Sequence, residues 1–157
     1  MLSLKKMKHL SNSEIKEINR KIRELYGIDG AIGKKDKAII EEGIIIINSK
    51  KIFFADTAVP TLRNVLDNKE LYDNMKKVTV DMGAVKFVTS GADIMRPGIV
   101  AFDDNISKDS IVLIIDEKHK KPLAVGKMLI PCEEAKNLTT GKIIKNMHYI
   151  GDKVWNN

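Results

Sequence analysis

The residue types that carry out enzymatic chemistry are few in this chain and lie far apart. No cysteine or carboxylate stands at metal-ligand spacing from any of the three histidines, His9, His119 and His148, which argues against a zinc site. The only cysteine, Cys132, has no histidine near it in the sequence, so a buried or idle thiol is favoured over a nucleophile. The carboxylate pairs Asp103-Asp104 and Glu133-Glu134 are interpreted as solvated turn residues. We therefore expect no enzyme activity, no metal and no cofactor.

Recognition of a phosphate-bearing ligand is the other chemistry that the sequence offers, in the segment from Val80 to Gly98. Its pattern predicts a strand, a short helix, a glycine turn and a second strand. The glycines of this turn permit positive φ, and Pro97 fixes the entry to the second strand. A loop without bulky side chains lets backbone N–H groups approach a phosphate or a base edge, and Lys86 and Arg96 supply positive charge on either side. A helix end joined to a strand by a tight turn explains the same residues without a ligand.

Charge is unevenly distributed along the 157 residues, whose net charge is +6. Residues 1–77 carry 16 Lys and Arg against 11 Asp and Glu, whereas residues 78–157 carry 11 against 10. A basic first half suggests an acidic partner, for which tRNA and rRNA are examples. A lysine-rich solvated surface is the alternative reading of the same charges.

The composition is that of a globular protein of the cytoplasm. Apolar residues make up 43% of the chain and aromatic residues 5%, so Ile, Val and Leu must fill the core. No apolar run approaches the ~18 residues of a transmembrane helix, and residues 1–6 lack the apolar region of a secretory signal. A single cysteine cannot form an intrachain disulfide, which fits a reducing compartment.

A small α/β domain is predicted for residues 1–77. The segment Ser11-Asn12-Ser13-Glu14 has the pattern of a capping box, and Gly27 is a suitable stop for the helix that it begins. One face of this helix is apolar at helical spacing, through Ile15, Ile18, Ile22 and Leu25.

A hairpin and a second helix follow in this domain. The β-branched run 44–47 predicts a buried strand, and Asn48-Ser49 turns the chain into a partner strand over 51–55. Pro60 opens a short helix with three residues directed inward, Leu62, Val65 and Leu66. The polar segment 67–77 ends the domain.

Residues 78–157 predict mostly short strands separated by turns. The expected strands are 99–102, 111–115, 123–130 and 142–150, followed by Gly151-Asp152 and a final Val154-Trp155. A helix over about 82–90 is expected between Asp81 and Gly91, and one helical turn over 133–136. Several short strands at close spacing are typical of a small barrel, which makes the whole chain an α+β protein.

Four blocks of residues in this second half occur in a defined order and spacing. They are Val80-Asp81-x-Gly83-Ala84, Val88-x-Ser90-Gly91-Ala92-Asp93-Ile94-Met95-x-Pro97-Gly98-Ile99, Leu123-Ala124-Val125-Gly126 with Gly141, and His148-Tyr149-Ile150-Gly151-Asp152-x-x-Trp155. Their order and spacing resemble the PUA domain, the RNA-binding module named after pseudouridine synthase and archaeosine transglycosylase. The resemblance implies that the glycine turn binds RNA.

A longer similarity reaches into the first half, through Phe53-Phe54 and Pro60-Thr61-Leu62-Arg63, and continues to Asn146-Met147-His148-Tyr149. Over residues 50–157, and weakly over 1–49, the chain resembles the malignant-T-cell-amplified-sequence family and its archaeal relatives. This resemblance implies a small α/β N-terminal domain (1–77) followed by a C-terminal PUA-type β-barrel (78–157). The Lys- and Ile-rich composition also suits an archaeal source.

The family resemblance implies a function as well as a fold. Eukaryotic members act with density-regulated protein on the small ribosomal subunit, in reinitiation, tRNA delivery and recycling. For this chain it implies binding of tRNA or small-subunit rRNA in translation initiation, reinitiation or recycling, without catalysis. The sequence has no fused initiation-factor-like domain, so we expect any such protein partner to be separate.

PUA domains hold RNA with the first helix, the glycine loop, the following strand and the last strand. Carried over to matching positions, the resemblance points to thirteen residues: Lys86, Ser90, Gly91, Ala92, Asp93, Met95, Arg96, Pro97, Gly98, His148, Tyr149, Lys153 and Trp155. Several have structural explanations too. Met95, Tyr149 and Trp155 can pack in the core, and His148 can hydrogen-bond internally. Arg96 stands in a turn before Pro97, where we expect it to be exposed and to have no structural role.

Three other functions remain open from the sequence. The chain can be the detached RNA-recognition subunit of a tRNA- or rRNA-modifying enzyme, because PUA domains often accompany such enzymes. It can be an enzyme with a catalytic N-terminal domain, although no constellation of catalytic residues supports this. It can also be a protein-interaction module whose basic surface meets an acidic protein.

Overall fold

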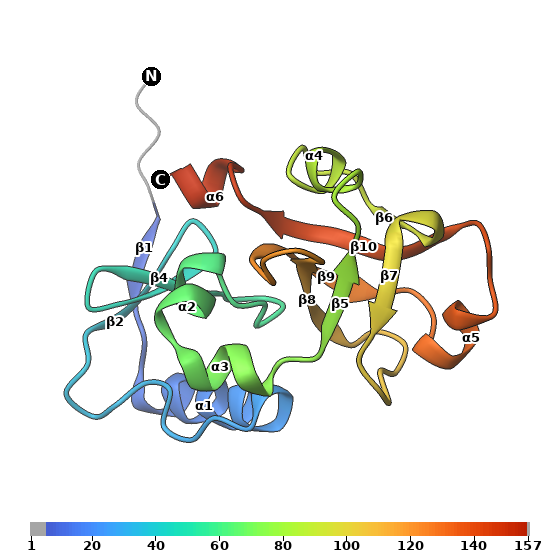
Figure 1. Cartoon of the computed structure of the whole chain (residues 1–157). Coiled ribbons are helices and arrows are strands. Elements are labelled where there is room, and N and C mark those ends of the chain that lie inside the picture. Colours follow the sequence, from blue (N-terminus) through green and yellow to red (C-terminus); the bar gives the residue numbers. More distant parts are fainter. Residues whose placement is uncertain (1–5, 157) are drawn as a thin grey trace. The chain divides into compact units, whose positions relative to one another are not determined.

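A computed structural model of the chain describes residues 6–156, which form two compact units that divide between Asn74 and Met75 (Figure 1). Each unit contains one sheet. A domain boundary after residue 77, as predicted, would leave the first residue of strand β5 (Lys77–Val80) in the N-terminal unit, and it stays a prediction. None of the helices within residues 6–156 is both long and apolar enough to cross a membrane.

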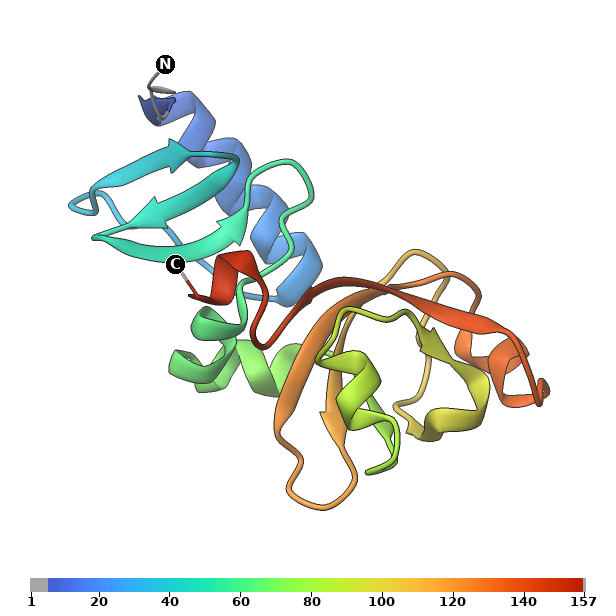
Figure 2. The same cartoon turned by 90° about the horizontal axis from the view of Figure 1, so that it is seen from above.

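The N-terminal unit is built on an antiparallel four-stranded sheet. Its strands follow the order β1 (Met7–His9), β2 (Ala38–Glu41), β3 (Ile44–Ile47) and β4 (Lys50–Phe54). Helix α1 (Asn12–Tyr26) lies along one face of this sheet (Figure 2), and there the rings of Tyr26 and Phe53 stack with their centroids 6.0 Å apart. Two short helices, α2 (Leu62–Asp67) and α3 (Lys69–Asn74), complete the unit. The predicted hairpin is confirmed as β3 and β4, whereas β1, β2 and α3 had no clear pattern in the sequence.

The predicted boundaries of α1 are confirmed. Ser11 Oγ accepts a hydrogen bond from the Glu14 N–H at 3.2 Å, and Glu14 Oε1 accepts one from the Ser11 N–H at 3.0 Å. Gly27 ends the helix with φ of 68°. The expected apolar stripe is wrong at its last member: Leu25 is exposed, and Tyr26, one turn after the buried Ile22, takes its place on the inner face.

The C-terminal unit is a six-stranded sheet in the order β6-β10-β9-β8-β5-β7. Besides β5, its strands are β6 (Ile94–Met95), β7 (Ile99–Phe102), β8 (Ile111–Asp116), β9 (Pro122–Met128) and β10 (Lys142–Tyr149). The pair β5–β8 is parallel and the other pairs are antiparallel. The two edge strands, β6 and β7, are joined by the single 3-10 turn η1 (Arg96–Gly98), so the sheet curves almost into a barrel. The predicted α+β fold class is confirmed.

Aliphatic side chains fill the barrel, with fully buried members from four strands that include Val78, Val112, Ile114 and Ile144. Gly126 allows β9 and β10 to approach closely, because an added Cβ would lie 2.4 Å from Ile144 Cγ2. Helix α5 (Cys132–Lys136) covers one end through Cys132, whose thiol is buried and whose Sγ accepts a hydrogen bond from the Ile106 N–H at 3.3 Å. The expectation of a buried thiol is confirmed.

Two predicted features are wrong in detail, and the conformation of the last residues was not predicted. The helix expected over 82–90 is the shorter α4 (Val85–Val88), because Asp81 Oδ1 accepts from the Ala84 N–H at 2.9 Å and closes a turn before the helix. The final Val154-Trp155 lies in helix α6 (Lys153–Asn156), which starts where Asp152 Oδ1 accepts from the Trp155 N–H at 2.8 Å. Leu66 is exposed and not directed inward.

Candidate nucleic-acid interface

In the glycine turn between α4 and β6, backbone N–H groups donate to carbonyl groups of the preceding helix. The N–H groups of Ser90 and Ala92 donate to Phe87 O at 3.1 and 3.0 Å, and that of Gly91 donates to Val88 O at 3.1 Å. These bonds wind the chain into a tight turn after the helix. The hydrogens of these three N–H groups already have acceptors within the turn, so these groups are not free to bind a phosphate.

An apolar hollow of about 390 Å³ lies beside this turn. It is lined by residues from the β5–α4 turn, α4, the glycine turn and η1, among them Ala84, Phe87, Ala92, Met95 and Pro97. Phe87 is 58% exposed and Met95 47% exposed, although both are large and apolar. A flat aromatic face and a thioether that are both open to solvent are suited to contact a planar ring. The structure thus brings together Ala92, Asp93, Met95, Pro97 and Gly98 of the predicted site.

Exposed lysines lie beside the hollow. Lys86 on α4 places its Nζ 5.1 Å from the centroid of the Phe87 ring. Lys142 Nζ on β10 forms an ion pair with Asp93 Oδ2 at 3.0 Å, and Lys145 on the same strand is exposed. Positive charge beside an apolar wall is the combination that binds single-stranded nucleic acid. Lys86 was predicted, whereas Lys142 and Lys145 were not.

The pKa of Asp93 is lowered, first by a hydrogen bond from the Asn146 N–H and then by Lys142 and Lys145, against the effect of partial burial. Asp93 is therefore ionised at neutral pH, and its negative charge is partly neutralised by Lys142. Its Oδ1 accepts from the Asn146 N–H at 2.9 Å. This carboxylate joins the glycine turn to β10. Asp93 and Asp81 are the charged residues that line the hollow, and the lysines lie beside it.

Asn146, like Phe87, Lys142 and Lys145, was not among the predicted site residues. Its Nδ2 donates to Val88 O and to Ala92 O, both at 3.0 Å, so one side chain on β10 holds both ends of the glycine turn. Its Oδ1 is buried, with no hydrogen-bond partner among residues 6–156. Half of the eight residues of β10 are polar, so the sequence of the strand carried no signal that singles out Asn146.

Tyr149 and Gly91 contact each other directly. A Cβ added to Gly91 would lie 2.9 Å from Tyr149 Cε1, and the φ of Gly91 is 93°. The Tyr149 ring also packs on the barrel core. Both residues therefore shape the turn, and their predicted contact with RNA remains a proposal.

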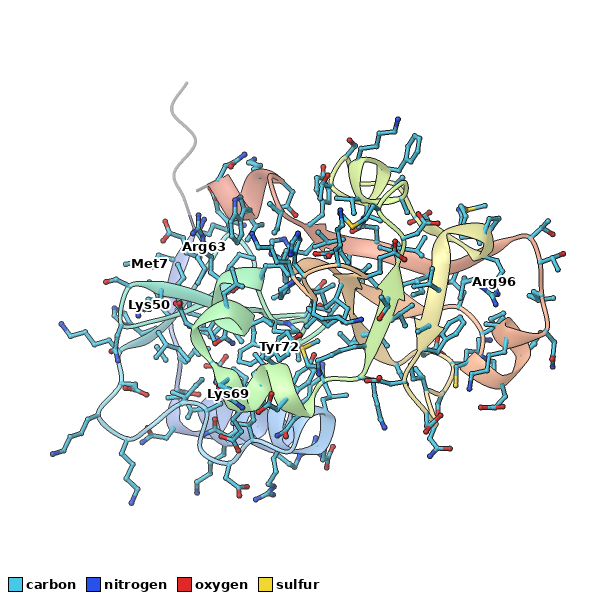
Figure 3. All side chains as sticks on the ribbon, viewed as in Figure 1. Met7, Lys50, Arg63, Lys69, Tyr72 and Arg96 are labelled. Carbon is cyan, nitrogen blue, oxygen red and sulfur yellow. The ribbon has the colours of Figure 1, made fainter. Side chains whose placement is uncertain are left out.

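The expectation that Arg96 is exposed and structurally idle is wrong. Its Nε donates to Ala135 O on α5 at 2.9 Å and its Nη1 donates to Ile99 O on β7 at 3.0 Å. The guanidinium also lies over the Phe102 ring, 5.5 Å from its centroid. Figure 3 shows Arg96 between β7 and α5. The side chain is half-buried and is not among the residues that line the hollow.

His148 is fully buried, and its Nδ1 lies 2.6 Å from Asp152 Oδ2. Burial lowers the pKa of His148, while the Asp152 carboxylate partly opposes this shift. Any part that His148 has in RNA binding must therefore act through its neighbours.

The remaining predicted residues lie outside the hollow. Lys153 is exposed and Trp155 is half-buried, both on α6, and neither lines the hollow. Ser90 is exposed next to Gly91, with its Oγ donating to Lys86 O at 2.7 Å.

The described residues hold no metal site. No group of three or more His, Cys, Asp or Glu side chains within residues 6–156 is arranged to hold a metal ion.

Comparison with known proteins agrees with this architecture. The PUA domain family matches residues 76–150. Over 162 aligned positions the chain is 32% identical to malignant T-cell-amplified sequence 1 of Rattus norvegicus, with 93% of this chain and 87% of the rat protein covered. The chain belongs to the malignant T-cell-amplified sequence family. The predicted family is thereby confirmed.

Other similar proteins come from archaea and fungi. An uncharacterized protein of Methanocaldococcus jannaschii is 40% identical to this family member over 99% of the chain and 98% of its own length. The translation machinery-associated protein 20 of Schizosaccharomyces pombe is 38% identical over 65% of the chain, which spans only 57% of that protein. A crystal structure of a hypothetical protein from the archaeon Pyrococcus horikoshii has a TM-score of 0.82 at 32% identity and covers 96% of this chain and 98% of that one.

Proposed function

We propose that this protein binds tRNA or small-subunit rRNA through the hollow beside its glycine turn, and that it acts in translation initiation, reinitiation or recycling without covalent chemistry. Its PUA domain and its relatives support RNA binding and an association with translation. On this proposal it is a cytoplasmic protein that acts together with an initiation-factor-like protein.

The observation that carries the proposal is the exposed Phe87 and Met95 in an apolar hollow with Lys86 and Lys142 nearby. Stacking of an unpaired base on an aromatic ring contributes ~1–3 kcal/mol, and neighbouring lysines neutralise the phosphates that flank the base. Single-stranded ends and loops are the parts of RNA whose bases are free to stack in this way. The CCA-like end of a tRNA and an rRNA loop both fit this description.

Substitution of Phe87 tests the proposal. We expect Phe87→Ala to weaken binding to the preferred RNA by about fivefold to a hundredfold, which corresponds to the loss of one stacked base. The measurement is fluorescence anisotropy with total tRNA, isolated small subunits and heparin as a polyanion control, across a salt series. Val100→Ala is the matched control, because Val100 is 51% exposed in the same unit but does not line the hollow.

Equal affinities of the wild type and Phe87→Ala for every RNA would contradict the proposed site. Equal and strongly salt-dependent binding to RNA and heparin would mean that only nonspecific charge is involved. Co-purification with a tRNA- or rRNA-modifying enzyme, without small subunits, would favour the accessory-subunit alternative.

A further inference from the structure

The N-terminal unit contains a hollow of its own, with a volume of about 310 Å³. Its inner wall is apolar and includes Ile28, Ile47 and Phe53, all of them buried, while Ala31 lies at its edge in the loop after α1. The volume is at the lower end of the ~300–1,000 Å³ range of small-molecule sites. It is large enough for one planar ring and lies on elements that the proposed RNA site does not use.

Two asparagines supply polar groups to this hollow. Asn64 on α2 is mostly buried, and its Nδ2 donates to Ile52 O at 3.3 Å, which fixes the amide and leaves its Oδ1 as an acceptor. Asn68 Oδ1 accepts from the Leu71 N–H at 3.1 Å, which leaves its Nδ2 as a donor. An amide oxygen and an amide NH₂ are the groups with which asparagine recognises the edge of a base.

One lysine lines the hollow, and three others lie in the loop before β2. Lys50, at the start of β4 (Figure 3), is one of the lining residues and is exposed. Lys37 is held beside the hollow because its N–H donates to Asn48 Oδ1 at 2.9 Å, and Asn48 is also a lining residue. The exposed Lys34 and Lys35 lie in the same loop. Within residues 6–156, none of these four lysines forms an ion pair with a carboxylate.

We propose that this hollow is a second nucleotide-binding site, which takes one unstacked RNA base against its apolar wall and the adjoining phosphates on Lys50 and Lys37. An acidic peptide would satisfy the lysines but would leave the apolar wall and the two amides without partners, so a nucleotide fits the hollow better. The inference rests on the proposed function, in that the ligand is RNA, but it concerns a separate site. It gives the basic N-terminal unit a specific contact in addition to its charge.

Titration of the full ¹⁵N-labelled chain with nucleotides, followed by NMR, tests the second site. The probes are the four nucleoside 5′-monophosphates, with inorganic phosphate and a hexaglutamate peptide as comparisons. We expect at least one nucleotide to shift the amide signals of Ala31, Asn48 and Asn64 saturably, with a dissociation constant on the order of 1 mM. Phosphate alone should leave the Asn64 side-chain signals in place.

Two variants separate the hollow from its charges. Ala31→Leu fills the hollow, and Asn68→Asp keeps the oxygen that accepts from Leu71 while replacing the donor by a negative charge; each should weaken nucleotide binding about tenfold or more. Lys50→Gln should weaken it about twofold to fivefold, as expected for a screened surface charge. Lys16→Gln is the matched control, since Lys16 is an exposed lysine on α1, and it should bind as the wild type does.

Unchanged nucleotide affinity in folded Ala31→Leu and Asn68→Asp would overturn this inference, as would tighter binding of hexaglutamate than of every nucleotide. The signals of residues 84–98 report on the other site in the same spectra. Shifts there without shifts in residues 28–68 would contradict the second site alone. The absence of shifts from both regions would contradict the proposed function as well.

Discussion

Arg96 is held by the protein's own backbone, and this limits what it can offer to a ligand. Its two hydrogen bonds, to Ala135 O and Ile99 O, connect α5 with β7, which are far apart in sequence. A turn position before proline suggests exposure, and no local pattern in the sequence reveals carbonyl groups that the fold brings close. The partial burial of Arg96 was therefore not predictable from the sequence, whereas the burial of Cys132 was.

Arg96→Ala should lower the free energy of unfolding by about 2–3 kcal/mol, because hydrogen bonds from a charged donor contribute ~1.5–3 kcal/mol and two carbonyl groups lose their partner. Urea denaturation followed by circular dichroism measures this. Lys108→Ala, which removes an exposed charge from the same unit, should change the stability by less than ~0.5 kcal/mol. A fully stable Arg96→Ala would contradict the structural role, and loss of RNA binding by a well-folded Arg96→Glu would support the predicted contact of Arg96 with RNA.

His148 should make the folding of this protein sensitive to pH below the ordinary histidine pKa of 6.5. Burial lowers its pKa in the folded state, so the unfolded state takes up a proton first as the pH falls. The stabilisation is complete above pH 6.5 and is lost towards the folded pKa. Between pH 7.5 and 5.5 we expect a loss of up to ~1.4 kcal/mol, the value for one pKa unit.

Urea titrations at these two pH values measure the effect of His148. His148→Gln should remove most of the pH dependence, whereas His119→Gln, which changes an exposed histidine in the β8–β9 hairpin, should retain it. Identical pH dependence in His148→Gln and the wild type would assign the effect to other groups.

At the scale of elements, the glycine turn is positioned by β10, a strand more than 50 residues away in the sequence. Asn146 bonds both ends of the turn, and Tyr149 packs against Gly91. The sequence predicted the turn, β10 and most other strands, since hydrophobic period and turn residues are local signals. Contacts such as Asn146 to Val88 depend on strand register, which is set by the whole sheet and cannot be derived from either segment alone.

Alanine variants of Gly91 and Gly141 distinguish the contact between Gly91 and Tyr149 from the strain of a positive φ. Gly91 and Gly141 have φ of 93° and 106°, but only a Cβ on Gly91 would approach another residue, 2.9 Å from Tyr149 Cε1. Each change to alanine should cost about 1–3 kcal/mol through its positive φ. Gly91→Ala should cost more than Gly141→Ala and should also weaken RNA binding, because the ring must move. Equal losses, measured by urea denaturation, would mean that Tyr149 adapts freely.

At the scale of the whole molecule, this protein combines one basic unit with one PUA domain. The charge asymmetry and the two units were both foreseen from the sequence. The second hollow was not, because residues 28, 47, 53, 64 and 68 come from a loop, two strands, one helix and the link between α2 and α3, which only the fold brings together.

The salt dependence of the RNA affinity should show which lysines of the two units contact RNA. Each neutralised phosphate of a single strand contributes a slope of ~0.7 to log K against log salt. The double variant Lys34→Gln/Lys35→Gln should therefore lower the slope by up to ~1.4 if both lysines contact RNA. Lys108→Gln/Lys118→Gln removes the same charge from exposed positions elsewhere and serves as the control. An equal change in both double variants would assign the slope to net charge and not to a defined surface.

Cys132 gives this protein an internal reporter of local opening. It is the only thiol in the chain and lies 1% exposed in the C-terminal unit. A thiol reagent can modify it only when α5 separates from the barrel, so the labelling rate in excess reagent measures how often that unit opens. Unfolding of the N-terminal unit alone leaves the thiol covered. Labelling with and without RNA would therefore show how strongly a bound ligand keeps the barrel closed, without any engineered label.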